Sequence, residues 1–132
     1  MTTGDKIRAI RVFRGMKQKE LGMAVGFSEK TADVRVAQYE SGSRTPKKPL
    51  LARFAKALQV KPQNFDAGTA DSAEAILWTL FWLDEDIRCC PEQEKLARHL
   101  REWHDKRREL LAGEITQEEY FDWKLNFDER SG

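Results

Sequence analysis

Residues 18–42 read QKELGMAVGFSEKTADVRVAQYESG, and their apolar spacing and glycines are the strongest indication of the fold. Apolar residues at helical spacing predict a short helix over 17–25, which Gly26 closes because glycine tolerates the left-handed backbone at a helix end. A second helix follows and is stopped by Gly42. The small residues Ala24 and Gly26 are expected to let the two helices approach closely. The stretch therefore predicts a tight pair of short helices.

Helical patterning continues on both sides of this pair. Upstream, apolar residues recur three and four apart across 4–14. Downstream, Pro49 suits the first turn of a helix over 50–58, and a last short helix begins near Pro62. Five short helices with Gly and Pro at their joints predict a compact all-α domain over 1–66.

Charge is unevenly divided along the chain. Residues 1–68 hold 14 Lys and Arg against 6 Asp and Glu, a net of +8, whereas residues 69–132 hold 9 against 16, a net of −7. A basic segment of this size is the electrostatic footprint of a protein that meets phosphate groups. The first half is therefore expected to bind nucleic acid.

The residues that carry a family resemblance are spread over 4–66: Gln18, Glu20, Leu21, Gly26, Ser28, Val36, Tyr39, Glu40, Gly42, Arg44, Pro46, Leu51, Ala52, Ala55, Ala57, Leu58 and Val60. Together they resemble the helix-turn-helix domain of the phage repressor and Cro family, also called the XRE family. The resemblance implies a five-helix, lambda-repressor-like domain whose third helix lies in the major groove of DNA. It also implies a transcriptional regulator, usually a repressor that binds its operator as a dimer, and a buried ion pair between Arg11 and Glu40.

The spacing between Gly26 and Val36 departs from the family pattern by about four extra residues, or about one helical turn. Either the third helix starts one turn early, capped by Ser28, or the extra residues loop out and Thr31 caps a helix that begins at Ala32. Both alternatives leave Arg35 and Gln38 on the groove side, where Arg35 suits a guanine edge and Gln38 suits an adenine edge. The candidate base-reading residues are Arg35, Gln38, Thr31, Asp33 and Val34.

Candidate phosphate contacts flank the third helix and the start of the second. A glutamine at a helix start can grip a phosphate together with backbone amides, and basic side chains in the neighbouring turns can neutralise others. These candidates are Lys17, Gln18, Arg14, Lys30, Arg44, Lys47 and Lys48.

The acidic half predicts about three further helices over 71–128, after a small, polar linker at 67–70 and before a loose tail at 129–132. The first of them is apolar nearly all round and must be covered on more than one side. Its aromatic residues Trp78, Phe81 and Trp82 are candidates for a dimer or partner interface. A homodimer would space two reading helices by about one DNA turn, about 34–36 Å.

An alternative function remains open at this point. The acidic helices could bind another protein, which would make the chain an interaction adaptor or an antitoxin-like component with secondary DNA binding. Residues 110–120 resemble the helical hairpin of short C-terminal domains attached to other modules, which also implies association.

Enzymatic, cofactor and membrane functions find no support in the pattern. Cys89 and Cys90 are adjacent, so they lack the usual gap between zinc ligands, and His99 and His104 are five apart on a helix, about 140° around its axis. No cofactor, metal or catalytic residue is expected. The longest apolar run is too short to cross a membrane, and the N-terminus lacks a secretory pattern, so a cytoplasmic protein with reduced thiols is expected.

Overall fold

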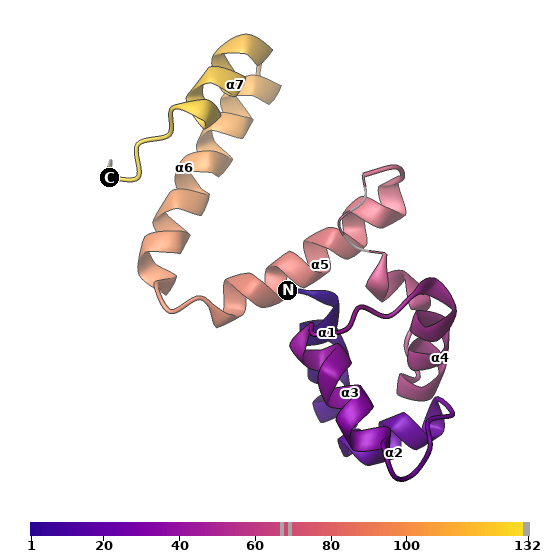
Figure 1. Ribbon diagram of the computed structural model, residues 1–132. Helices are drawn as coiled ribbons and strands as arrows, with labels where there is room; N and C mark the ends of the chain where they lie inside the picture. Colours follow the sequence, from indigo (N-terminus) through magenta and orange to yellow (C-terminus); the bar gives the residue numbers. More distant parts are fainter. Residues whose placement is uncertain (67, 69, 131–132) are drawn as a thin grey trace. The chain divides into compact units, whose positions relative to one another are not determined.

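The computed structural model describes residues 1–66, 68 and 70–130, and this part of the chain is all-helical (Figure 1). The elements are α1 (Thr3–Phe13), α2 (Gln18–Ala24), α3 (Ala32–Ser41), α4 (Lys48–Leu58), the 3₁₀ helix η1 (Pro62–Phe65), α5 (Ala73–Cys89), α6 (Gln93–Leu111) and α7 (Gln117–Leu125). The predicted fold class is confirmed: short N-terminal helices followed by three more. Residues 67 and 69 of the predicted linker and 131–132 of the predicted tail lie outside the described residues.

The chain forms two compact units, Met1–Asp86 and Ile87–Gly132. The linker expected at 67–70 stays a prediction, and the two units divide after Asp86. The reason is that most of α5 belongs to the first unit, where one of its faces packs.

The core of the first unit is assembled from all of its elements. Phe54 of α4, Ile7 of α1, Leu21 of α2 and Val36 of α3 are the central side chains, each almost completely buried. In α1 and α4 the buried apolar residues recur three or four positions apart, at Ile7 and Ile10 and at Leu50, Phe54 and Leu58, so each of these helices turns one apolar stripe inward. Leu51, which resembled a core position, is only partly buried and packs at the core's edge.

The closest approach between α2 and α3 occurs at Gly22. A Cβ atom placed there would lie 2.7 Å from both the Cβ and the carbonyl oxygen of Ala32. Glycine is thus required because any side chain would push the helices apart. The expectation that Ala24 and Gly26 make this approach was wrong, since Ala24 is exposed and Gly26 acts through its positive φ of 98°.

Helix α5 lies with one face against the helices that precede it in the first unit. Ala75 is buried, Trp82 packs against the core, and the Ser72 hydroxyl accepts a hydrogen bond from the Ala75 amide at the start of the helix. At the other end, the N-terminal amine of Met1 contacts Asp86 Oδ2 at 2.7 Å. The Trp82 packing and the Met1–Asp86 ion pair attach α5 to the N-terminal helices, whereas the Ser72 bond caps the start of α5 itself.

In the second unit α6 and α7 lie side by side as a hairpin (Figure 1). A capping box opens α7: Thr116 Oγ1 accepts from the Glu119 amide at 3.1 Å, and Glu119 Oε1 accepts from the Thr116 amide at 3.0 Å. Trp103 Nε1 donates to Tyr120 Oη at 2.6 Å across the pair. Tyr120 is the only buried side chain among the described residues of this unit.

Candidate nucleic-acid interface

Helix α3 begins at Ala32, directly after Thr31. The extra residues form a turn in which the Thr31 amide donates to the Ser28 carbonyl at 3.1 Å. Of the two alternatives left open by the sequence, the structure thus has the one in which the extra residues loop out. The Thr31 hydroxyl makes no capping hydrogen bond to the helix.

The buried side of α3 is formed by Ala32, Val36, Tyr39 and Glu40. The other side carries the predicted base-reading residues. Thr31, Val34, Arg35 and Gln38 recur three and four positions apart and so share one face, whereas Asp33 lies around the helix from it. Thr31 and Val34 are exposed, and Arg35 and Gln38 are half-buried.

Two of the predicted base readers have defined surroundings. The Arg35 guanidinium carbon lies 3.7 Å from the ring centroid of Phe27. The main-chain carbonyl of Gln38 accepts from the Arg44 amide at 3.2 Å and from the Ser41 and Ser43 hydroxyls at 3.1 and 3.3 Å. The turn that follows α3 is therefore folded back onto the helix end, which brings Arg44 near Gln38.

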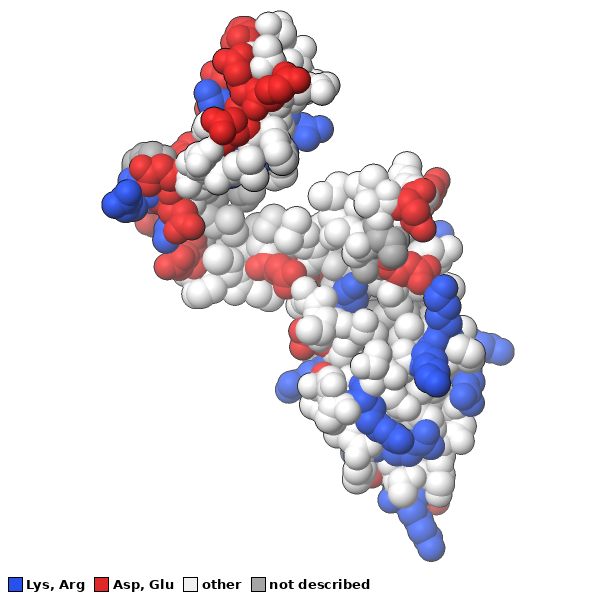
Figure 2. All heavy atoms as spheres, turned by 45° about the horizontal axis from the view of Figure 1, so that its top comes forward, with Lys and Arg blue, Asp and Glu red and all other residues white. Residues whose placement is uncertain are grey.

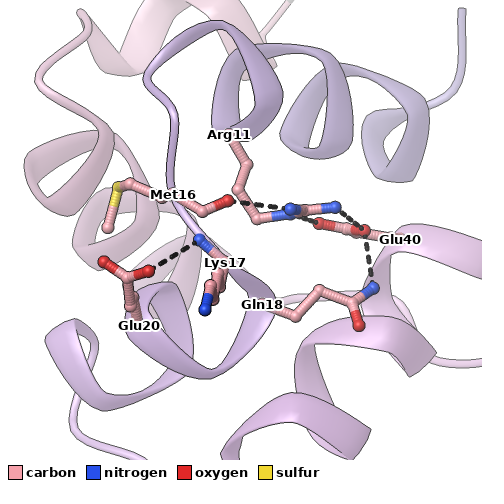
Figure 3. Close-up of polar contacts among 6 residues, drawn as sticks. All are labelled: Arg11, Met16, Lys17, Gln18, Glu20 and Glu40. Carbon is pink, nitrogen blue, oxygen red and sulfur yellow. Dashed lines mark hydrogen bonds and ion pairs between the residues drawn. The ribbon is translucent and has the colours of Figure 1, made fainter.

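A buried polar network holds α3 to α1 and α2 (Figure 3). Arg11 Nε contacts Glu40 Oε2 at 2.6 Å and its Nη2 contacts Oε1 at 3.1 Å, while Nη1 donates to the Met16 carbonyl at 2.9 Å. Gln18 Nε2 also donates to Glu40 Oε1, at 3.0 Å. The ion pair implied by the family resemblance is present, with side chains 12% and 4% exposed.

The predicted phosphate-binding residues divide by their surroundings. Two of them have partners inside the unit, since Gln18 donates to Glu40 and Arg14 donates to the carbonyls of Leu58 and Gln59 at 2.8 and 2.9 Å. The other side chains are exposed: Lys17, Lys30, Arg44, Lys47 and Lys48. On the face drawn in Figure 2, Lys and Arg side chains are the main charged groups over the N-terminal helices.

A groove beside α3 gathers basic residues that are distant in sequence. It is lined by Arg35, Tyr39, Arg44, Thr45, Lys47, Pro49, Leu50 and Arg53. Sequence reasoning missed Arg53, which reaches from α4 to donate to the Val25 carbonyl at 3.2 Å. Its only sequence signal is that it lies one turn after Pro49 on the same helix.

The aromatic residues predicted to form an interface lie in different environments on α5. Trp82 packs on the core, with its ring centroid 5.5 Å from Lys6 Nζ. Trp78 is half-buried and meets Phe81 edge to face at 5.6 Å. The solvent side of α5 instead presents Ile76, Leu77, Leu80, Phe81 and Leu83.

Lys6 is an unusual cation because it is buried beneath α5. Burial lowers the pKa of its ammonium group below the ordinary value, and the nearby Asp86 carboxylate opposes part of this change. Its Nζ reaches the Asn64 carbonyl at 3.5 Å.

Within 1–66, 68 and 70–130, no group of three His, Cys, Asp or Glu side chains is arranged to hold a metal ion, and Cys89 and Cys90 are unpaired thiols. No helix in this part of the chain has the length and apolar character to span a membrane.

Residues 7–65 match the family described as helix-turn-helix, a range that runs from α1 to η1 and contains α2, α3 and the network around Glu40. No curated protein matches the chain.

Proposed function

Residues 7–65 form a helix-turn-helix domain of the XRE type, the DNA-binding domain of transcriptional regulators, and from this premise we propose that the protein is a repressor that occupies a palindromic operator as a homodimer. Members of this family are usually repressors, and for this reason we propose repression rather than activation of transcription. The operator sequence is read by α3.

The observation that carries this proposal is the way α3 is held. Its inward face is fixed by Val36, Tyr39 and the Glu40 network, so the opposite face is presented as a rigid surface. Arg35 on this face suits a guanine edge, and Gln38 suits an adenine edge. Thr31 and Val34 flank them. The Thr31 hydroxyl suits a hydrogen-bond acceptor on a base edge, and the Val34 side chain suits a thymine methyl group.

The exposed cations are proposed to position this face on the duplex. Lys17 and Lys30 lie before α2 and before α3, and Arg44 and Lys47 follow α3. Phosphate contacts from both ends of a reading helix fix its register in the groove without reading sequence. Lys48, at the start of α4, is the neighbouring candidate.

Dimerisation is proposed through the helices after residue 71. Helices α6 and α7 have one buried side chain between them and so lack a core of their own. A domain this small buries too little apolar surface to be stable by itself. Phe121 and Leu125 on α7 are 58% and 66% exposed. A second copy covering this side of α7 would complete the hairpin's core and place two reading helices on one operator.

The DNA part of the proposal is tested with an Arg35→Ala, Gln38→Ala variant. We expect it to lose binding to a duplex enriched from random DNA while its helical content, measured by circular dichroism, is unchanged. Unchanged binding to that duplex would remove these residues from the reading face.

The dimer part is tested by sedimentation of the full chain. The unmodified chain is expected to be a dimer at micromolar protein concentration. The Phe121→Ser, Leu125→Ser double variant is expected to be a monomer at the same concentration. Phe13→Ser is a matched control, because Phe13 is an exposed phenylalanine on α1. A monomeric unmodified chain, or a dimer that persists in the double variant, would contradict this interface.

A second function is favoured by the uncovered apolar side of α5, which suits a protein-interaction adaptor or antitoxin-like component. This function predicts that DNA enrichment returns no preferred sequence. It also predicts that a protein that co-purifies with the unmodified chain is lost from a Leu80→Ser, Phe81→Ser variant.

A further inference from the structure

Phe27 occupies the turn between α2 and α3 and lies against Arg35, one of the proposed base readers. The guanidinium carbon is 3.7 Å from the ring centroid, which is contact distance. A guanidinium within about 6 Å of an aromatic centroid is attracted by the ring's quadrupole. Arg35 is therefore held on the ring by both packing and electrostatics.

The Phe27 ring is itself fixed by the core. It is 8% exposed, stacks on Tyr39 at 6.1 Å with an interplanar angle of 24°, and meets Phe54 edge to face at 6.3 Å. Tyr39 and Phe54 also contact each other edge to face at 5.8 Å. Three rings that restrain one another give Phe27 little freedom to turn away from Arg35.

Among the described residues the Arg35 guanidinium donates no hydrogen bond, so none of its N–H groups has a partner in this part of the chain. An arginine side chain carries about 2 kcal/mol of rotamer entropy, so binding DNA from a disordered rotamer is costly. A prearranged guanidinium avoids part of that cost.

We propose that Phe27 is a positioning residue that holds Arg35 ready for one guanine of the operator and so sets sequence specificity at that base pair. This inference rests on the proposed function, in which α3 reads DNA. The inference also gives residues 28–31 a role. These looped-out residues connect Phe27 to α3 and let the Arg35 side chain lie over the Phe27 ring.

The test is a double-mutant cycle on the full chain with a duplex enriched from random DNA and its single-base-pair variants. Phe27→Leu keeps an apolar side chain but removes the aromatic face. We expect it to weaken binding to the enriched duplex by about tenfold and to erase the preference at the same base pair as Arg35→Ala. In the Arg35→Ala background, Phe27→Leu is expected to change affinity less than about twofold.

Two controls separate positioning from stability. Phe65→Leu alters another phenylalanine that is 8% exposed in the same unit, and it is expected to lower stability with base preference intact. Phe27→Tyr keeps the aromatic face and is expected to retain the preference. All titrations are made well below the lowest melting temperature of the set.

One measurement needs no variant. In the unmodified chain, the ring current of Phe27 is expected to shift the Arg35 side-chain protons upfield in the NMR spectrum, and unshifted protons would overturn the inference. Equal weakening of all duplexes by Phe27→Leu, or additive effects with Arg35→Ala, would overturn it while leaving the proposed function standing. An unmodified chain without any base preference would overturn both, before any variant is compared.

Discussion

Arg11 Nε and Glu40 Oε2 lie 2.6 Å apart, in an ion pair that joins α1 to the last turn of α3. The same Glu40 carboxylate also accepts a second hydrogen bond from Arg11 and one from the Gln18 amide. Three helices therefore meet at the Glu40 side chain. The orientation of α3 is therefore set by a buried charge as well as by apolar packing.

Breaking this pair on one side should be costly, because the remaining charge stays buried without its counterpart. Glu40→Gln is expected to lower the free energy of unfolding by about 3 kcal/mol, measured by urea denaturation. Arg11→Met combined with Glu40→Leu should cost much less than the sum of the single changes. A loss below about 1 kcal/mol for Glu40→Gln would show that the pair does not stabilise the domain.

Lys6 gives a pH-dependent prediction. Its folded-state pKa is lowered by burial, so the unfolded chain binds more protons in the range between that lowered value and 10.5. Stability must then rise with pH across this range, and the full cost of the buried charge is present at neutral pH. Lys6→Met is expected to stabilise the protein by roughly 1 kcal/mol at pH 7.

Thermal unfolding at several pH values checks this prediction. The advantage of Lys6→Met over the unmodified chain should shrink as the pH approaches 10.5. A variant that is less stable at pH 7 would mean that the contacts with Trp82 and Asp86 outweigh the desolvation of the ammonium group.

Gly22 offers a test of helix packing. Replacing a helical glycine by alanine normally stabilises a helix by roughly 0.5–1 kcal/mol. Here Gly22→Ala is expected to destabilise the protein by about 2 kcal/mol, because the new Cβ would meet Ala32. Ala24→Gly, at an exposed position of the same helix, should cost only the propensity difference, and a stabilised Gly22→Ala variant would refute the close approach.

The cations around α3 should differ in their effect on salt dependence. Arg44→Ala and Lys47→Ala are each expected to weaken binding to all duplexes and to reduce the slope of log K against log salt by about 0.9. Arg14→Ala should instead lower the melting temperature, because Arg14 donates to the end of α4. An unchanged slope for both Arg44→Ala and Lys47→Ala would exclude them as phosphate contacts.

Much of the first unit could be predicted because its helix ends are marked by residues with strong backbone preferences. Gly26 and Gly42 both have positive φ, and Pro49 lies in the first turn of α4. The start of α3 could not be predicted, since both Ser28 and Thr31 are residue types that cap helix N-termini. The packing of Ala32 of α3 against Gly22 of α2 distinguishes the two possible helix starts. This packing involves two helices, so the pattern within one helix does not reveal it.

The face of α5 that packs could not be predicted from its sequence. Its nearly continuous apolar pattern indicates a helix but does not distinguish the face that packs from the face that stays exposed. The sequence therefore predicts one interface for Trp78, Trp82 and Phe81, although Trp82 lies against the core. Likewise, the partners of Arg14 and Arg53 are backbone carbonyls of other helices, which no local pattern reveals.

Enrichment of random duplex DNA on the full-length protein, followed by fluorescence anisotropy of the enriched duplex against scrambled DNA at several salt concentrations, tests whether the protein binds DNA by sequence. We expect a palindromic duplex that is preferred by at least about 10³-fold at physiological salt. Equal binding to both duplexes that disappears as salt rises would contradict the account, because it would show that the protein senses only the charge of DNA.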